Sequence, residues 1–137
     1  MTPDEAREKN VGYLVASAEE SLESAKSELA AGRRRFSINR VYYACFYMAS
    51  AVLLAEARHF VKHAGVRSAL HEHLVNKGRL ATSWGDFYDE MFQARHQGDY
   101  GRFVVFDPAM VSEAIQRAEA FVTEMKRLLG SASGHSE

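Results

Sequence analysis

The stretch VYYACFYMASAVLLA, from Val41 to Ala55, decides the fold of this chain. It is apolar on almost every side of a helix, so a helix made from it must be buried by several neighbours rather than along one stripe. Its 15 residues fall short of the roughly 18 to 20 that cross a bilayer. The stretch therefore predicts the central helix of a protein core, from about residue 36 to 58, and no membrane partner.

The segments on both sides of this stretch show the period of amphipathic helices. Apolar residues recur at every third or fourth position over residues 11–29, and more regularly over 111–129. The later segment follows Asp107 and Pro108, which supply an N-cap and a first-turn proline. The expected long helices are 4–31, 36–58, 82–97 and 108–129, and a shorter helix covers 63–75.

Long helices with short connections favour one architecture. We expect an all-α fold, an up-down bundle of four long helices with an additional short helix between the second and the fourth. The length of 137 residues suits a single domain, over residues 1–130, followed by a small, polar and disordered tail at 131–137. Residues 103–106 are too few to assign by period, and we interpret them as an extended segment packed on the bundle.

The composition gives the chain no strong overall charge. Its 17 basic and 18 acidic residues leave a net charge of −1, so a nucleic acid or membrane would have to meet a local patch. The single cysteine, Cys45, cannot form an intramolecular disulfide, and the N-terminal residues lack a basic-then-apolar signal pattern. Both observations predict a reducing, cytoplasmic location.

The expected topology brings polar residues from two helix ends together. The second and fourth helices run antiparallel, so the start of one lies beside the finish of the other. Guanidinium groups donate paired hydrogen bonds to phosphate, which makes RNA or a nucleotide the natural ligand of such an end. The alternative is that Arg33 to Arg35 form a solvated turn and that Arg40 and Arg95 pair with Asp99 or Glu90. The residues in question are Arg33, Arg34, Arg35, Asn39 and Arg40 at one helix end, and Arg95, Asp99, Tyr100 and Arg102 at the other.

The segment RHQGDYG, residues 95–101, contains two groups that could move protons. Imidazole titrates near neutral pH, whereas a phenol has a pKa of about 10, so His96 is the better acid or base by chemistry. By geometry His96 lies about 100° round the helix from Arg95 and could simply face solvent. Tyr100 could equally pack its ring against the helix end.

No metal or cofactor is expected. His59 and His63 have the spacing of two ligands on one helix face, but they straddle the expected break between helices. His71 and His73 are two residues apart and face different directions. No nucleotide-binding or serine-hydrolase motif occurs. The aromatic residues within 42–47 are expected to pack in the core rather than to stack on bases.

Four segments together resemble a known family. They are NRVYYACFYMASAVLLAEA (39–57), KHAGVRSALHEHLVNKG (62–78), FQARHQGDYGRFVVF (92–106) and the final amphipathic helix. In this order and spacing, over about residues 8–129, the chain resembles the HEPN domain family, in particular its small prokaryotic stand-alone branch. The resemblance implies a helical bundle, commonly dimeric, that is often encoded beside a minimal nucleotidyltransferase as a toxin and antitoxin pair.

The resemblance also implies a chemistry. Active members of the family are metal-independent endoribonucleases, in which an Arg holds the scissile phosphate and a His a few positions later assists attack by the ribose 2′-hydroxyl. Arg95 matches that Arg, and His96 matches the polar position after it. Asn39 and Arg40 match polar positions that line the family's cleft. The family's His has no counterpart, because Tyr100 stands in that window.

The prediction is therefore a toxin-like HEPN protein that acts on RNA without a cofactor. The alternative is a non-catalytic module that binds RNA, a nucleotide or a partner nucleotidyltransferase. The resemblance further implies a homodimer, and Tyr100 as a possible site of AMPylation by the partner. The predicted catalytic residues are Arg95, His96, Asp99 and Tyr100, and the predicted phosphate-binding residues are Arg33, Arg34, Arg35, Asn39, Arg40 and Arg102.

Overall fold

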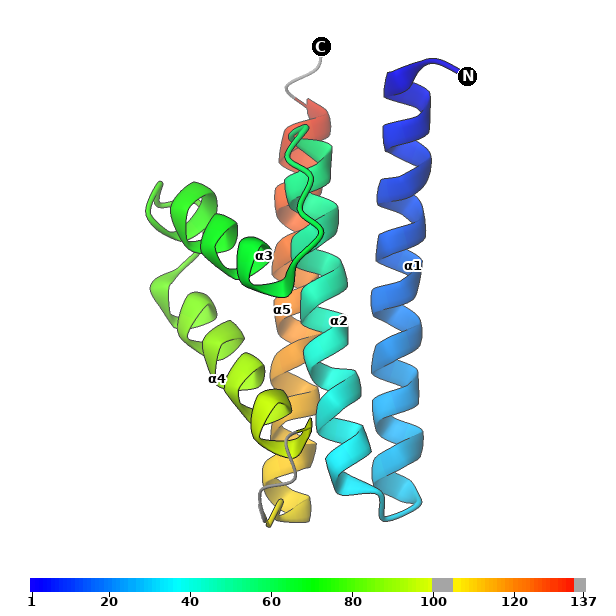
Figure 1. Cartoon of the computed structure of the whole chain (residues 1–137), viewed down its shortest axis with the longest axis vertical. Helices are drawn as coiled ribbons and strands as arrows, with labels where there is room; N and C mark the ends of the chain where they lie inside the picture. Colours follow the sequence, from blue (N-terminus) through cyan, green and yellow to red (C-terminus); the bar gives the residue numbers. More distant parts are fainter. Residues whose placement is uncertain (100–104, 135–137) are drawn as a thin grey trace.

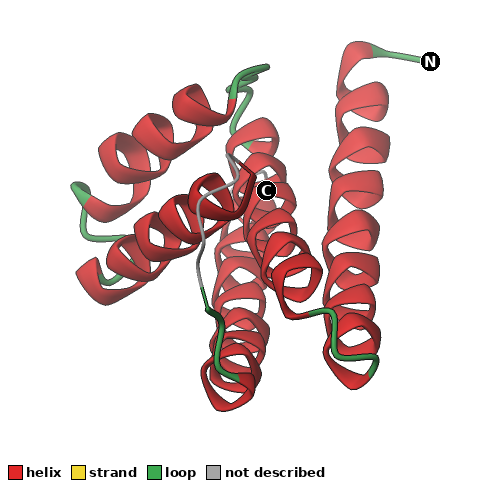
Figure 2. Cartoon of the chain, turned by 60° about the horizontal axis from the view of Figure 1, so that its bottom comes forward, coloured by secondary structure: helices red, strands yellow, loops and turns green. Residues whose placement is uncertain are grey.

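The computed structural model is a bundle of helices (Figures 1 and 2). The structure describes residues 1–99 and 105–134, with side chains over 1–95 and 105–131, and contains no strand within these ranges. The elements are α1 (Pro3–Ala30), α2 (Arg34–Ala55), α3 (His63–Leu70), the π-helical turn η1 (His71–Val75), α4 (Thr82–Asp99) and α5 (Pro108–Gly134).

The predicted all-α architecture is confirmed. The long helices α1, α2, α4 and α5 alternate in direction, and α3 with η1 forms the shorter element between α2 and α4 (Figure 1). The boundaries differ in places. Helix α2 ends before the predicted residue 58, because Ala57 adopts a left-handed backbone with φ of 62°. Helix α5 continues past Gly130 to Gly134, and residues 135–137 of the predicted tail lie outside the described residues.

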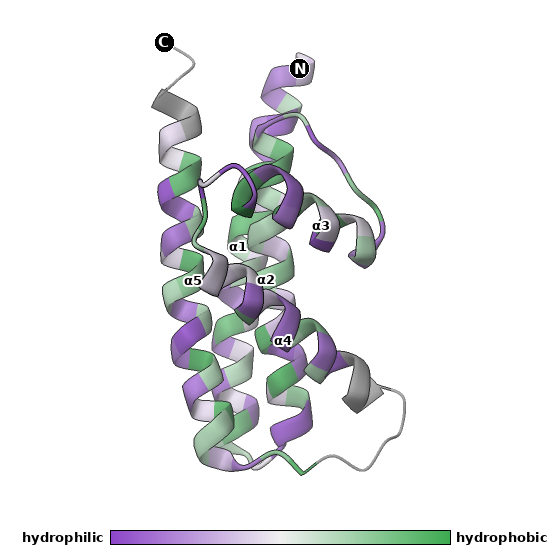
Figure 3. Cartoon of the chain, turned by 90° about the vertical axis from the view of Figure 1, so that its left-hand side faces the viewer, coloured by the Kyte–Doolittle hydropathy of each residue, from purple (hydrophilic) through white to green (hydrophobic). Residues whose placement is uncertain are grey.

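Helix α2 is the core of the bundle. It packs against α1, α3, α4 and α5, and residues such as Tyr42, Met48 and Leu53 have no exposed surface. Within the described residues it is also the one helix long and apolar enough to cross a membrane, but its neighbours cover it as they would cover any core helix. Helix α5, by contrast, alternates hydrophobic and hydrophilic residues along its length (Figure 3).

Small side chains let α1 and α2 approach closely. Ala18 and Ala25 on α1 are fully buried, and so is Ser37 on α2. The Ser37 hydroxyl donates a hydrogen bond of 2.7 Å to the carbonyl oxygen of Ala25. Gly32, with φ of 79°, allows the tight reversal that places the two helices side by side.

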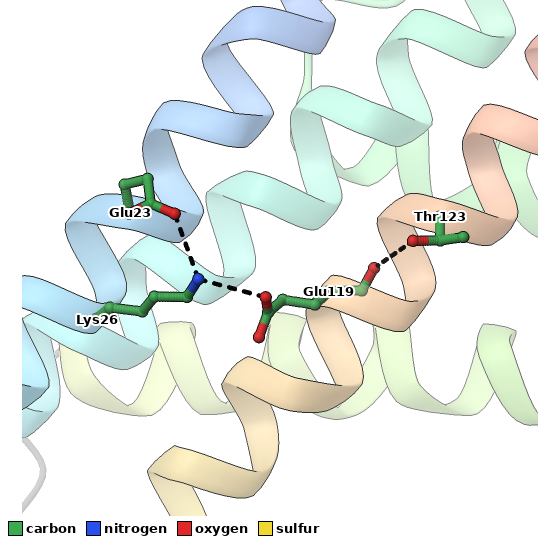
Figure 4. A network of polar contacts seen from close by, with 4 residues as sticks. All are labelled: Glu23, Lys26, Glu119 and Thr123. Carbon is green, nitrogen blue, oxygen red and sulfur yellow. Dashed lines mark hydrogen bonds and ion pairs between the residues drawn. The ribbon is translucent and has the colours of Figure 1, made fainter.

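Ion pairs on the surface connect α1 to α5. The Lys26 ammonium lies 3.3 Å from carboxylate oxygens of both Glu23 and Glu119, and the Thr123 hydroxyl donates to the Glu119 carbonyl (Figure 4). Exposed pairs of this kind contribute little to stability, because water screens them. The placement of α5 is therefore determined mainly by its buried apolar face.

The connection after α2 runs back along the bundle before α3 begins (Figure 1). This path places His63, the first residue of α3, against Tyr42 and Phe46 near the middle of α2. The following turn η1 lies close to α4 at Gly85, where an added Cβ would stand 2.8 Å from the His71 ring. Gly85 thus permits the contact that fixes α4.

We predict that Ala25→Leu destabilises the fold by about 1 to 3 kcal/mol, because the added atoms cannot fit between α1 and α2. The free energy of unfolding from urea titration measures the effect. Ala16→Leu is the matched control, because Ala16 lies on the exposed side of the same helix. Equal stability of the two variants would show that the helices can separate without cost.

Candidate functional site

Two arginines from different helices share one aromatic ring. The Arg40 Cζ atom, near the start of α2, lies 5.0 Å from the Tyr43 ring centroid, and the Arg95 Cζ atom, near the end of α4, lies 5.6 Å from the same centroid. Arg95 also lies over Tyr42, at 5.3 Å. Each such cation–π contact contributes about 0.5 to 2 kcal/mol, depending on how far it is desolvated. The antiparallel course of α2 and α4 thus brings these two cations to one place.

Asn39 orients the Arg40 guanidinium. The Arg40 Nε donates a hydrogen bond of 3.1 Å to Asn39 Oδ1, and Nη2 donates to the same oxygen. Both side chains are half-buried. Because an amide oxygen carries no net charge, this contact restricts the arginine while leaving its positive charge in place.

An imidazole from α3 joins the same aromatic cluster. The Nδ1 atom of His63 lies 2.6 Å from the Tyr42 hydroxyl oxygen. The His63 ring stacks on Phe46, with centroids 4.2 Å apart and planes 21° from parallel, and meets Tyr43 edge-on at 5.7 Å. His63 is half-buried rather than enclosed.

The surroundings shift the pKa values of this cluster. Burial raises the pKa of Tyr42 to about 12, so Tyr42 is a neutral phenol at physiological pH. Burial, followed by the positive charge of Arg95, lowers the pKa of His63. Both effects disfavour the imidazolium ion, so His63 is largely neutral at pH 7.

The three arginines at the start of α2 have partners of their own. Arg33 forms an ion pair with Glu28 at 2.6 Å. Arg34 donates to the carbonyl oxygen of Phe106 at 3.3 Å, and Arg35 lies over the ring of the residue that follows it. All three side chains are exposed. Of the predicted basic residues in this turn and in α2, Arg40 is the one that lies over the same ring, that of Tyr43, as Arg95 of α4.

Part of the predicted site lies outside the described residues. The backbones of His96 and Asp99 belong to α4, but their side chains are not described, and neither Tyr100 nor Arg102 is. Glu90, the alternative partner proposed for Arg40 or Arg95, forms its ion pair with Arg117 at 3.2 Å. Of the segment 103–106, Phe106 is buried against the core.

A second polar cluster connects α3 and η1 to α4. The Asp89 Oδ1 atom accepts hydrogen bonds from Arg67 Nε at 2.8 Å and from His71 Nε2 at 3.0 Å. The Arg67 guanidinium also lies over Phe92, which in turn meets Tyr42 at 6.0 Å. Partial burial acts to raise the pKa of Asp89, but the hydrogen bonds from Arg67 and His71 outweigh it and lower that pKa. This cluster fixes how α4 meets α3.

The described residues offer no group of three or more His, Cys, Asp and Glu side chains that could hold a metal ion. A cleft of about 390 Å³ lies between α1, the end of α2 and the connection that follows. Its lining is mainly apolar, so it does not suit a phosphate. The residues that line it are Asn10, Tyr13, Leu14, Phe46, Ser50, Leu53, Leu54, Arg58, His59, Phe60 and Val66.

Sequence reasoning missed His63 as a member of this site. In the sequence, His63 stands out only by its ligand-like spacing from His59, which lies exposed in the connection before α3. Local pattern gives no indication that residue 63 contacts residues 42 and 46, because the contact depends on the path of that connection. Of the aromatic residues within 42–47, Tyr42 is fully buried, whereas Tyr43, Phe46 and Tyr47 keep part of their surface exposed.

The fold and the site together define a class of protein: an all-helical bundle that presents arginine, tyrosine and histidine side chains where α2, α3 and α4 meet. The HEPN domain, as a family, matches residues 11–128 of this chain. The chain therefore belongs to the HEPN domain family, as the sequence predicts.

Individual relatives span nearly the whole chain. The chain is 39% identical to a UPF0332 protein of Thermotoga maritima over 123 residues, which cover 90% of this chain and 93% of that protein. It is 33% identical to a protein of Methanocaldococcus jannaschii named "Putative toxin MJ0605", with 88% and 90% covered. A second protein of that organism, "Putative toxin MJ0142", is 23% identical, with 85% and 79% covered.

We predict that Asp89→Asn lowers the free energy of unfolding at pH 7 by about 1 kcal/mol, because Arg67 and His71 lose a charged acceptor. The folded-state pKa of Asp89 is depressed, so its contribution is complete above the unfolded pKa of about 4 and is lost as pH falls through the folded value. The difference between the two proteins should therefore shrink below about pH 4.

Urea titrations at a series of pH values measure this difference. Asp86→Asn, an exposed carboxylate on the same helix, is the control and should change stability little at any pH. A difference for Asp89→Asn that stays constant down to pH 2.5 would contradict the assignment.

Proposed function

We propose that this HEPN protein is a toxin-like protein that acts on RNA as a metal-independent endoribonuclease, with Arg95 as the ligand of the scissile phosphate. The convergence of Arg40 and Arg95 on the Tyr43 ring is the observation that carries the proposal. The names of the two relatives from Methanocaldococcus jannaschii support the toxin-like role.

The arrangement suits a phosphodiester for a physical reason. A guanidinium group stays charged at any physiological pH and donates two parallel hydrogen bonds to phosphate oxygens. Tyr43 holds both arginines over its ring, and Asn39 restricts Arg40, so little conformational entropy is lost when an anion binds. We propose that Arg95 contacts the scissile phosphate and that Arg40, with Asn39, contacts a neighbouring one.

The other sequence-based assignments join this proposal as predictions. His96, Asp99 and Tyr100 remain candidates for the catalytic set, and Arg33, Arg34, Arg35 and Arg102 for more distant phosphates. Homodimer formation, a minimal nucleotidyltransferase as partner, AMPylation of Tyr100 and a cytoplasmic location are likewise predictions.

The test is cleavage of total RNA by the purified protein in the presence of EDTA. We expect cleavage by the unmodified chain and a loss of about 100-fold or more in Arg95→Ala, because the developing charge on the phosphate loses its main ligand. Arg117→Ala is the matched control. The Arg117 guanidinium also lies over an aromatic ring, with Cζ 4.5 Å from the Phe87 centroid. Arg117→Ala therefore removes one positive charge and one ring contact, as Arg95→Ala does, but away from the candidate site.

Intact RNA would contradict the enzymatic proposal. If the unmodified protein still bound RNA and Arg95→Ala weakened that binding, the site would be a non-catalytic phosphate-binding module instead. Equal cleavage by Arg95→Ala and Arg117→Ala would remove Arg95 from the site.

A further inference from the structure

We propose that His63 is the general base of this site and accepts the proton of the ribose 2′-hydroxyl during RNA cleavage. The proposal rests on the function proposed above and names a residue from α3, outside the helix that carries Arg95. The observation behind it is that His63, Arg40 and Arg95 all contact the ring of Tyr43.

The geometry of His63 leaves one ring nitrogen available. Nδ1 lies 2.6 Å from the Tyr42 hydroxyl oxygen, and the ring is held against Phe46 by stacking at 4.2 Å. Because Nδ1 is engaged with Tyr42, Nε2 on the other side of the ring is the nitrogen that can accept a proton. We assign the tautomer in which Nδ1–H is donated to the Tyr42 oxygen, which leaves the Nε2 lone pair as the base.

Tyr42 connects the base to the phosphate ligand. Its hydroxyl contacts His63, while its ring lies 5.3 Å from the Arg95 Cζ atom. Tyr42 is fully buried, so it holds both groups on a rigid support. Tyr42 is thus a positioning residue, and it stays a neutral phenol because burial raises its pKa to about 12.

The charges around His63 favour the neutral form that a base requires. Among the described side chains, the titratable and charged groups that face it are Tyr42 and Tyr43 on α2 and Arg95 on α4. Burial and the charge of Arg95 lower the pKa of His63 below its usual range. The rate should therefore rise as pH increases through a value below about 6.5 and then level off.

The proposed step balances as a transesterification. His63 Nε2 takes the proton from the 2′-hydroxyl, the 2′-oxygen forms a bond to phosphorus, and the bond from phosphorus to the 5′-oxygen breaks. The leaving 5′-oxygen takes up a proton from water, and the imidazolium later returns its proton to solvent. The products are a 2′,3′-cyclic phosphate and a 5′-hydroxyl end, and no metal or oxidant is consumed.

The test compares variants on a short RNA oligonucleotide in EDTA. We expect His63→Gln to lower kcat by about 100-fold or more, with little change in RNA affinity, and to abolish the acidic limb of the pH profile. Tyr42→Phe should lower kcat by a smaller factor, because His63 remains but loses its partner. His59→Gln, an exposed imidazole in the preceding connection, should leave the rate unchanged.

Two further measurements separate chemistry from folding. Circular dichroism should show equal helix content in all variants, and added imidazole should restore part of the activity of His63→Gly but not of Arg95→Ala. A substrate with a 2′-deoxy sugar at the cleaved position should remain intact. His63→Gln with undiminished kcat or an unchanged acidic limb would overturn the proposal.

The failure of this inference can be told from the failure of the proposed function. If the unmodified protein cleaves RNA with dependence on Arg95 but not on His63, only the assignment of the base is wrong. If the unmodified protein does not cleave RNA at all, the proposed function itself fails.

Discussion

The burial of α2 is the constraint on which the rest of the structure depends. A helix that is apolar on nearly every side cannot bury its surface against a single neighbour, so α1, α3, α4 and α5 all pack against it. Those neighbours need only one apolar stripe each, as the alternation along α5 shows (Figure 3). Their directions and positions follow from the surface of α2 that each one covers.

The same constraint creates the site. The covering of α2 is incomplete along one stripe of the helix, where Tyr43, Phe46 and Tyr47 keep part of their surface exposed. An aromatic face can hold cations by its quadrupole, and imidazole by stacking. Arg40, Arg95 and His63 occupy such faces. The candidate site thus lies where the core helix is only partly covered by its neighbours.

The sequence was sufficient for the fold because the decisive signals are local. Period, N-caps and the apolar run over 41–55 predicted the helices, and their order predicted that α2 and α4 run antiparallel. That topology alone brings Arg40 near Arg95. It did not distinguish Arg40 from Arg33 and its neighbours, because ion pairs such as Arg33 with Glu28 depend on side-chain detail at the α1–α2 turn.

The contacts of α3 could not be predicted for a different reason. The connection of residues 56–62 has no period and could have led α3 to either end of α2. Its return path places His63 beside Tyr42, twenty-one residues earlier in the chain. The π-helical turn at 71–75 and its close approach to Gly85 come directly after α3. The period of apolar residues predicts which face each helix buries. It does not predict where an irregular connection places the next helix.

Phosphate recognition also depends on how a cation is held. Arg33, Arg67 and Arg117 each pair with a carboxylate, which offsets their charge and commits them to structure. Arg40 is held by the Asn39 amide oxygen and the Tyr43 face, neither of which carries a net charge. Among the described side chains, these contacts leave the positive charge of Arg40 in place where α2 and α4 meet. A chain with a net charge near zero can in this way present a local field that attracts an anion.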